Sequence, residues 1–574
     1  MPIPRILREH LPAILLAALI GVASGAPQFY LIRAMGDSYQ NIFPISSDDD
    51  RYYEARAQEV RDGFPMLGNP YVYELRDAEQ ARPWVTDAML SYSGAFLGLD
   101  VQHTFALFDF LLPPVLFLFS YGILLSATRS RLLSLLAAAI FHIGFFLDTF
   151  IRSPSPQFNF LFVEAALLAG LAILQRTRHM YIVLAVLLGF LFYVYPYYWT
   201  FAFGAIGMFF LATFLRKELR NFSLPFFCAL LGGALIGLPA VIQTAQISHT
   251  AAYQETIWRL GLISSHTPAG LSSILLSGGV LLSYALTLFF APQMRADKKT
   301  WFFGSIVLGG ILAANNQLVT GHELEYSSHY FLPCAYAAFI AAAYLWNELA
   351  PVLLQQAGRA AQHVTRLAVL AAVILIAIGG AKSVTARVYV KTNDLADQRY
   401  GELVQWLKAN TAPESVVMTD DYTSYMIAAY TSDRIFYSRD ANVHLMTNEE
   451  AWTRLMLMYR DARLDDDFFL HHVGEIWSTH YFNEYGHSAQ LNKLRGIFGL
   501  PQIPIEMIPR SAKDGFRAFA ANLEKKPAAE VLNGRKLDYA ISDPDFITPS
   551  WLKISFPAMH AVYSVNGFTV YALR

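Results

Sequence analysis

Long apolar runs separated by short polar segments fill the first two-thirds of the chain. Each run extends over roughly 18 to 24 residues, which is enough for a helix to cross a hydrocarbon layer of about 30 Å. The pattern therefore predicts an α-helical polytopic membrane protein with about eleven transmembrane helices. The predicted spans are residues 11–34, 103–126, 131–151, 157–175, 180–196, 199–215, 223–244, 271–291, 300–317, 330–349 and 367–386.

The pattern changes after residue 386, where the apolar runs become short. The segments "ESVVMTDD" and "LDYAISDPD" predict buried strands, and "QRYGELVQWLKANT" predicts an amphipathic helix. The segment "AVYSVNGFTVYAL" predicts two strands joined by a turn at Asn566-Gly567. We therefore expect a transmembrane domain over 1–386, which includes a long first loop over 35–102, and a small α/β domain over 387–574.

Composition agrees with a membrane protein and excludes some functions. The chain has 574 residues, of which 55% are hydrophobic and 15% charged, whereas soluble domains average roughly 25% charged residues. A net charge of −2 gives no basic footprint for a nucleic acid. Cys228 and Cys334 lie in predicted spans and suggest no disulfide framework.

Basic residues in the short loops predict the orientation. They gather on one side of the membrane, which the positive-inside rule assigns to the cytoplasm: Arg5, Arg8, Arg129, Arg131, Arg176, Arg178, Arg216, Lys217, Arg220, Arg295, Lys298, Lys299, Arg359 and Arg366. The opposite short loops offer mainly Arg152 and Arg259. The N-terminus is then cytoplasmic, and the first loop and the C-terminal domain are extracytoplasmic. The glycosylation sequon at Asn221 falls on the predicted inner side, which favours a prokaryotic plasma membrane.

An acidic helix is predicted directly after the first span, in "SSDDDRYYEARAQEVRDG" (46–63). Ser47 or Asp48 can cap its first turn, and Gly63 is a natural end. The simplest interpretation is that the three aspartates only start the helix, because acidic residues stabilise the positive end of the helix dipole.

Periodicity gives this helix an apolar face. At about 100° per residue, Asp49 shares a face with Tyr53 and Ala57, and we expect that face to rest on the membrane bundle. Asp50 aligns with Glu54 on the side expected to be wetter. A carboxylate at the buried end of an interfacial helix is costly unless it has a partner or a function.

The run "DDDRYYEARAQEVRDG" resembles the first-loop motif of GT-C integral membrane glycosyltransferases, which place Asp-Asp or Asp-Glu followed by Tyr on a juxtamembrane helix. The group includes protein mannosyltransferases, aminoarabinose transferases and oligosaccharyltransferases. The following "PMLGNPYVYE" and a second amphipathic helix near "TDAMLSYSGAFLGL" also resemble that loop.

The resemblance implies an inverting glycosyltransferase that uses a polyprenyl-phosphate-type sugar donor held in the bilayer. The acceptor would be a lipid, a glycan or a protein, and the first-loop aspartate would act on the acceptor nucleophile. An alignment on Arg51-Tyr52 favours Asp48, whereas the face argument favours Asp49. Both stay open as the catalytic residue.

Other candidates face the same compartment. Arginines suit a phosphate leaving group, the polar loop "NNQLVTGHELEYSSHYF" suits a sugar or phosphate, and interfacial aromatic residues suit a sugar ring. The candidate substrate-binding residues are Asp50, Tyr53, Arg259, His266, Arg152, Asn316, Gln317, His322, Glu323, Glu325, His329 and Tyr197. Helix capping, snorkelling, a solvated loop and an aromatic belt are the simpler explanations. Acids are rare in spans, so Asp109 and Asp148, near the outer ends of theirs, are further candidates.

Two questions remain open in the sequence. A divalent metal ion, Mg²⁺ or Mn²⁺, is possible, with Asp48, Asp49 and Glu323 as hard oxygen ligands, but no fixed spacing indicates one. The alternative function is a non-catalytic transporter or flippase for a glycan lipid. That function favours polar groups at mid-membrane depth and two repeated halves, and the sequence suggests neither.

Overall fold

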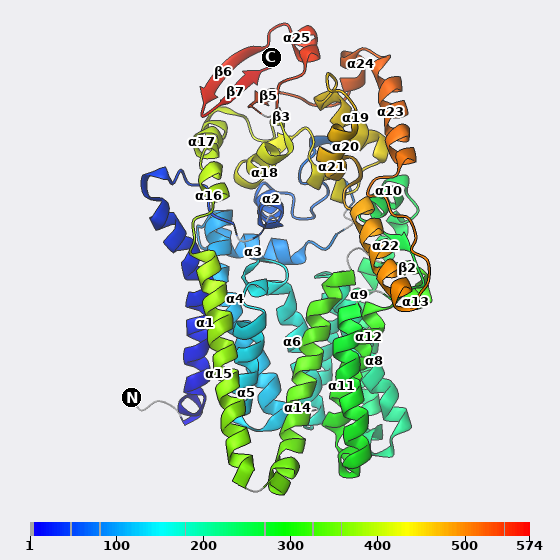
Figure 1. The fold of residues 1–574 in the computed structure, drawn as a ribbon. Coiled ribbons are helices and arrows are strands. Elements are labelled where there is room, and N and C mark those ends of the chain that lie inside the picture. Colours follow the sequence, from blue (N-terminus) through cyan, green and yellow to red (C-terminus); the bar gives the residue numbers. More distant parts are fainter. Residues whose placement is uncertain are drawn as a thin grey trace.

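The computed structural model describes residues 5–574 except 46, 48, 80–81, 178, 269–270, 324–326, 358 and 545. Figure 1 shows a bundle of long helices with a smaller layer of helices and strands stacked on one end. Two helices of the first loop, α2 (Asp49–Arg61) and α3 (Val85–Phe96), lie between the bundle and this upper layer. The start of α1 lies at the opposite end of the bundle from the C-terminus.

Each predicted span coincides with helical structure in the bundle. Its helices are α1 (Arg5–Met35), α4 (Val101–Thr128), α5 (Arg131–Ala139), α6 (Gln157–Leu174), α7 (Met180–Leu191), α8 (Pro196–Leu215), α9 (Ser223–Ile247), α11 (Leu271–Phe290), α12 (Lys298–Ala314), α14 (Phe331–Ala357) and α15 (Arg359–Arg387). Among the described residues, 6 helices are long and apolar enough to cross a membrane. The helical bundle is thus confirmed, and the count of about eleven crossings stays a prediction.

One predicted span is not a continuous helix. The segment 131–151 begins as α5, widens into a π-helix over Ile140–Phe145 and ends in a 3-10 turn over Thr149–Ile151. Asp148 lies in the break, where its carboxylate accepts a hydrogen bond from Ser383 and lies 3.7 Å from the Arg387 guanidinium. Hydropathy carries no signal for such a break, because the residues on both sides remain apolar.

A large apolar core fills the bundle, with Phe117, Phe160, Phe302 and Tyr336 fully buried in it. The helices α7 and α8 are joined by a short connection, and Pro196 is the first residue of α8. Proline suits that position because the first helical N–H needs no partner.

The upper layer contains a mixed sheet in the order β4-β3-β5-β7-β6. Its strands are β3 (Val416–Met418), β4 (Arg434–Ile435), β5 (Tyr539–Ser542), β6 (His560–Val565) and β7 (Phe568–Ala572). β3 is parallel to β4 and β5, whereas β5 and β6 are antiparallel to β7. The expected turn joins β6 to β7, with Asn566 at φ 47° and Gly567 at φ 87°. The predicted strands and the hairpin are therefore confirmed.

Helices surround this sheet. They are α16 (Thr392–Asp397), α17 (Tyr400–Asn410), α18 (Asp421–Tyr430), α19 (Asn448–Met458), α20 (Asp466–His471), α21 (Val473–Trp477), α22 (His480–Ile497), α23 (Arg510–Glu524), α24 (Ala528–Leu532) and α25 (Ser550–Ser555). The predicted amphipathic helix is α17. The short helices α10 (Ala251–Arg259) and α13 (Gln317–Thr320) and the two-residue strands β1 (Ile263–Ser264) and β2 (His322–Glu323) connect the bundle to this layer.

The first loop shares a core with the C-terminal region. Ile42, Ala55 and Tyr71 of the loop are buried in the same apolar cluster as Met418 and Leu403 of the upper layer. The loop backbone also joins the sheet region, because the Tyr71 carbonyl accepts a hydrogen bond from the Ile435 N–H at 3.0 Å. The acidic helix α2 is therefore held from both sides.

Candidate functional site

The first turn of α2 uses the acidic residues in two different ways. Ser47 Oγ accepts a hydrogen bond from the Asp49 N–H at 3.3 Å, and Asp50 Oδ2 accepts one from the Ser47 N–H at 3.0 Å. This reciprocal pair is a capping box. Asp50 therefore has a structural role in starting the helix, whereas the Asp49 carboxylate takes no part in the cap.

The prediction for the two faces of α2 is wrong in part. Ala57 and Val60 are buried as expected, but Glu54 is also buried, with 4% of its surface exposed. The Asp49 side chain, expected at a buried end, is 60% exposed. The upper layer explains the difference, because it covers the side of α2 that periodicity assigned to water.

Buried ion pairs hold α2 in place. Glu59 pairs with Arg434 of β4, and both side chains are 2% exposed. Arg56 pairs with Asp87 of α3 at 2.7 Å. These contacts fix the helix against the upper layer and the second loop helix, and so fix the position of its first turn.

The side chain of Asp49 contacts the bundle through Arg152. Arg152 Nη1 lies 2.5 Å from Asp49 Oδ2, and its Nε donates to the Ser155 carbonyl at 2.7 Å. Burial by itself would lower the pKa of Arg152, but Tyr53, Asp49 and neighbouring groups raise it. The guanidinium therefore stays charged beside the carboxylate, at the end of the bundle that faces the upper layer.

Aromatic side chains line the same region. The Tyr195 hydroxyl lies 2.6 Å from His329 Nδ1, and the His329 ring stacks on Tyr197 with 4.9 Å between ring centroids. Burial and the positive charges of Arg152 and Arg82 lower the pKa of His329 to about 4. His329 is thus a neutral imidazole near pH 7, within the electrostatic reach of Arg152.

The sequence did not indicate two further charged groups, Asp440 of the upper layer and Arg82 of the first loop. Asp440 is half-buried, and burial raises its pKa to about 6, with Arg439 opposing and Asp49 adding to the rise. Arg82 donates from Nε to the Val443 carbonyl at 3.1 Å and is close enough to lower the pKa of both His329 and Asp440. Arg82 was missed because it lies in the long first loop, outside the short loops searched for cations. Asp440 carries no motif.

A small cavity lies under the start of α2. Its volume is about 30 Å³, room for about one water molecule, and its lining includes Asp50, Glu54 and Asp109. Asp109 is held there by amide donors of Gln28 at 3.1 Å and Gln157 at 3.0 Å. This position agrees with the expectation that Asp109 lies near the end of its span beside α2. The acid of α2 that shares the cavity with Asp109 is Asp50, whereas Asp49 is not among its lining residues.

Arg259 is held by contacts with the upper layer. It is fully buried, and it donates to Met446 O at 2.6 Å, to Asn448 Oδ1 at 2.5 Å and to Asn442 O at 3.3 Å. These partners all lie in the upper layer, so Arg259 joins α10 to that layer. Its expected contact with a lipid donor stays a prediction, and the sequence does not reveal how the C-terminal region folds back over α10 to bury this side chain.

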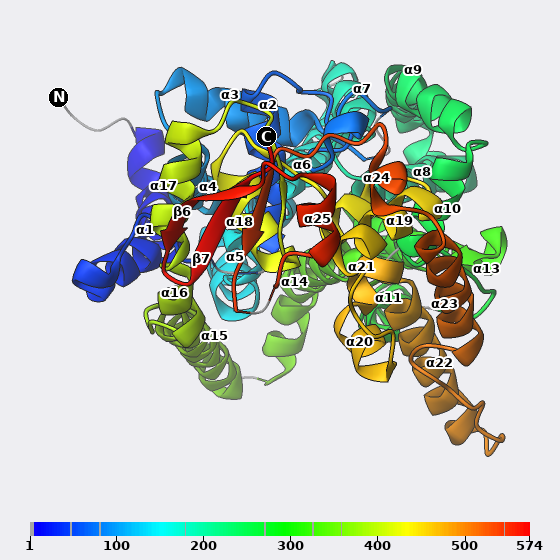
Figure 2. The same ribbon diagram turned by 90° about the horizontal axis from the view of Figure 1, so that it is seen from above.

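The polar loop after α12 also has structural partners. Gln317 donates to Thr267 O at 3.2 Å, His266 Nδ1 lies 3.3 Å from Leu318 O, and β1 pairs with β2. Glu323 pairs with His487 of α22 at 3.0 Å. Both views place α13 at the edge of the molecule, away from α2 (Figures 1 and 2).

The remaining loop candidates do not join Asp49 either. Asn316 donates to the Ala313 carbonyl of its own helix end at 2.9 Å, and His322 is exposed in β2. Asp48 and Glu325 lie outside the described residues. Of the candidates that the structure describes, Asp49, Asp50, Tyr53, Arg152, Tyr197 and His329 therefore form one group.

A metal site gains no support from the described residues. None of them form a group of three or more His, Cys, Asp or Glu side chains able to hold an ion. Glu323 in particular contacts His487 of α22, so the two suggested ligands that the structure describes, Asp49 and Glu323, are not brought together by any contact.

Comparisons with known proteins identify the fold. No protein-family model and no curated protein matches the sequence. The oligosaccharyltransferase AglB from Archaeoglobus fulgidus, in complex with an inhibitory peptide and a dolichol-phosphate, matches with a TM-score of 0.53 at 11% identity, over 96% of this chain and 70% of that chain. The apo form of the A. fulgidus oligosaccharyltransferase matches with a TM-score of 0.51 at 12% identity, over 93% and 69%.

A third solved structure is ArnT from Cupriavidus metallidurans bound to undecaprenyl phosphate, with a TM-score of 0.49 at 12% identity, over 99% of this chain and 98% of that chain. At these identities the two oligosaccharyltransferase structures, with TM-scores of 0.53 and 0.51, establish the architecture alone. The architecture that the first-loop resemblance implies is confirmed: the chain has a GT-C-like fold.

Proposed function

We propose that this protein is an inverting glycosyltransferase that moves a sugar from a polyprenyl-phosphate-type lipid to an acceptor at the extracytoplasmic face of a prokaryotic plasma membrane. The observation that carries the proposal is the 2.5 Å contact between Asp49 and Arg152 at the end of the bundle that faces the upper layer. The fold supports it, since the A. fulgidus oligosaccharyltransferase with this architecture was found in complex with dolichol-phosphate, a polyprenyl phosphate.

The pair supplies the two functions that such a transfer needs. The acceptor nucleophile attacks the anomeric carbon, the bond from that carbon to the phosphate oxygen breaks, and the electron pair moves to the phosphate. Asp49 takes the proton of the nucleophile, and the Arg152 guanidinium donates hydrogen bonds to the departing phosphate. Attack opposite the leaving group inverts the anomeric centre.

The surroundings of the pair suit a polar acceptor. Asp440 of the upper layer lies within electrostatic reach of Asp49 and of Arg82, while Tyr53 and His329 lie within reach of Arg152. The acceptor therefore enters between the bundle and the upper layer, and the donor phosphate approaches Arg152 from the membrane side. The acceptor is a lipid, a glycan or a protein.

The proposed topology follows the loop charges. The transmembrane domain covers 1–386, with a cytoplasmic N-terminus, and the extracytoplasmic domain covers 387–574. In this orientation the acidic helix α2 and the whole Asp49 group face the outer compartment, where a lipid-linked sugar would be presented.

The test is transfer by purified protein in vesicles that contain polyprenyl-phosphate sugars, with wild type compared with Asp49→Asn and Asp48→Asn. We expect Asp49→Asn to reduce the transfer rate by about 10² to 10⁴-fold, the typical contribution of a positioned proton acceptor. Asp77→Asn is the matched control, since Asp77 lies in the same loop and its side chain is 77% exposed.

The outcomes separate the alternatives. Loss of transfer in Asp48→Asn with Asp49→Asn intact would move the catalytic role by one residue. Full transfer in both variants would refute the catalytic assignment. Sugar lipid that crosses the vesicle membrane without being consumed would support the flippase instead.

A further inference from the structure

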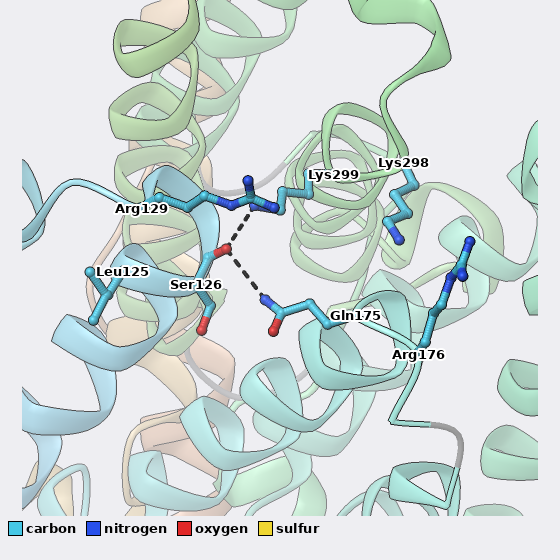
Figure 3. A pocket seen from close by; sticks show the side chains of 7 residues that line it. All are labelled: Leu125, Ser126, Arg129, Gln175, Arg176, Lys298 and Lys299. Carbon is cyan, nitrogen blue, oxygen red and sulfur yellow. Dashed lines mark hydrogen bonds between the residues drawn. The ribbon is translucent and has the colours of Figure 1, made fainter. Parts of the chain in front are cut away.

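A basic cavity opens at the opposite end of the bundle from the Asp49 group. It has a volume of about 470 Å³ and is lined by Leu125, Ser126, Arg129, Gln175, Arg176, Lys298 and Lys299 (Figure 3). Three helices supply these residues: α4 and α6 end here, and α12 begins here. The lining contains no acidic side chain.

The two lysines have structural partners. Lys299 Nζ donates to the carbonyls of Ser126 and Ala127 at 2.8 Å each, and Lys298 Nζ donates to the Leu174 carbonyl. The last carbonyls of a helix lack intrahelical partners, so the lysines satisfy the ends of α4 and α6. Their presence is explained without a ligand.

The two arginines are not explained in this way. Arg129 and Arg176 follow the ends of α4 and α6 with φ of 58° and 72°, a conformation that terminates helices. Within the part of the chain that the structure describes, neither guanidinium has a hydrogen-bond or ion-pair partner, and both are exposed at the cavity. Each therefore has all its N–H donors available for an anion.

The position of the cavity relative to the membrane indicates which kind of anion it binds. The ends of membrane-crossing helices lie at the level of lipid headgroups, and basic pockets between such helices bind acidic headgroups. Apolar side chains are also available, because Leu125 lines the cavity and Leu132, at the start of α5, is 59% exposed. A lipid can thus place its phosphate between the arginines and its acyl chains along α4 and α5.

We propose that this cavity binds the phosphate headgroup of an anionic phospholipid, held by Arg129 and Arg176, in the leaflet opposite the proposed transfer site. By the predicted orientation this is the cytoplasmic leaflet. The site is independent of the sugar transfer, because no residue of the Asp49 group lines it.

The experiment measures lipid binding to the purified full-length protein by native mass spectrometry. Phosphatidylglycerol, phosphatidylcholine and free glycerol 3-phosphate are added in separate arms to wild type and to the Arg129→Gln/Arg176→Gln variant. We expect wild type to prefer phosphatidylglycerol over phosphatidylcholine by tenfold or more, and the variant to lose that preference, since each cation near an anionic headgroup contributes appreciably to binding. Free glycerol 3-phosphate should bind much more weakly than phosphatidylglycerol at the same concentration.

The matched control is Lys217→Gln/Arg220→Gln, which also removes two charges at the predicted inner face. Lys217 and Arg220 are exposed but do not line the cavity, so the preference should persist. A second measurement needs no variant: raised salt should weaken the preference in wild type. Equal phosphatidylglycerol binding in wild type and the cavity variant would overturn the proposal, and equally tight binding of free glycerol 3-phosphate would assign the cavity to a soluble anion instead.

Discussion

Neighbouring aspartates at the start of α2 differ in what surrounds them. Asp50 accepts a hydrogen bond from the Ser47 N–H and lines the small cavity beside Asp109, so its role is to stabilise the structure of the first loop. Asp49 points to Arg152, which comes from a segment 103 residues away in sequence. In the sequence, a role in starting the helix was a sufficient explanation for all three acids. The structure describes Asp49 and Asp50, and of these two only the Asp50 carboxylate caps the helix.

Arg152 should be a functional residue with little effect on stability. Its pair with Asp49 is partly exposed, with 26% and 60% of the two side chains accessible, and exposed pairs contribute about 0–1 kcal/mol. We expect Arg152→Gln to leave the thermal unfolding midpoint of the purified protein nearly unchanged and to lower kcat for sugar transfer by at least tenfold, because the leaving phosphate loses its cation.

The variant Arg152→Lys distinguishes charge from geometry. Lysine retains the positive charge but lacks the planar fork that binds two phosphate oxygens at once, so it should restore part of the transfer rate. A large drop in the unfolding midpoint in either variant would instead make Arg152 a structural residue of the loop.

At the scale of elements, α2 depends on buried ion pairs more than on an apolar face. The Glu59–Arg434 pair joins α2 to β4 and is almost inaccessible to water. Removing one partner leaves an uncompensated buried charge, which costs about 3–5 kcal/mol, whereas removing both charges costs much less. We expect Glu59→Leu to lower the free energy of unfolding by that amount, and Glu59→Leu/Arg434→Met to recover most of it, as measured by denaturant unfolding of the solubilised protein.

Transfer activity provides the second readout for this pair. The double variant should keep α2 in place and retain activity, whereas Glu59→Leu should lose activity together with stability. If the single and double variants were equally destabilised, the anchoring role of the charges would be refuted and only the lost volume would matter.

The elements themselves were largely predictable, and their surroundings were not. The helix α2, the helix α3 and the hairpin at Asn566-Gly567 follow from local signals: an N-cap, a 3.6-residue period and a turn that requires positive φ. The burial of Glu54 and the hydrogen bonds of Arg259 depend on how the C-terminal region packs against the first loop and α10. Periodicity shows which side of a helix is apolar. It cannot show that the upper layer covers the polar side of α2 and pairs with its charges.

At the scale of the whole molecule, hydropathy predicted a bundle followed by a mixed domain, and the fold confirms that order. The union of the first loop with the C-terminal region was not predictable, because its contacts join distant parts of the chain. The Phe43 N–H donates to the Tyr430 hydroxyl across 387 positions, and Gln102 donates to the Ala429 carbonyl across 327. Such pairs leave no periodic signal in a single sequence. Asp440 approaches Asp49 only through this union.

The shared core makes the first loop and the C-terminal region one folding unit. Tyr71 is fully buried between them, and its carbonyl accepts from the Ile435 N–H. We expect Tyr71→Ala to cost about 3–5 kcal/mol, as for other large buried aromatic residues, and to speed amide hydrogen exchange in β3 and β5 as well as in the loop. The matched control is Phe302→Ala, which removes an equally buried ring from the bundle core and should leave exchange in β3 and β5 unchanged. Faster exchange confined to the loop after Tyr71→Ala would mean that the loop unfolds independently, and the position of Asp49 would then depend on the bundle alone.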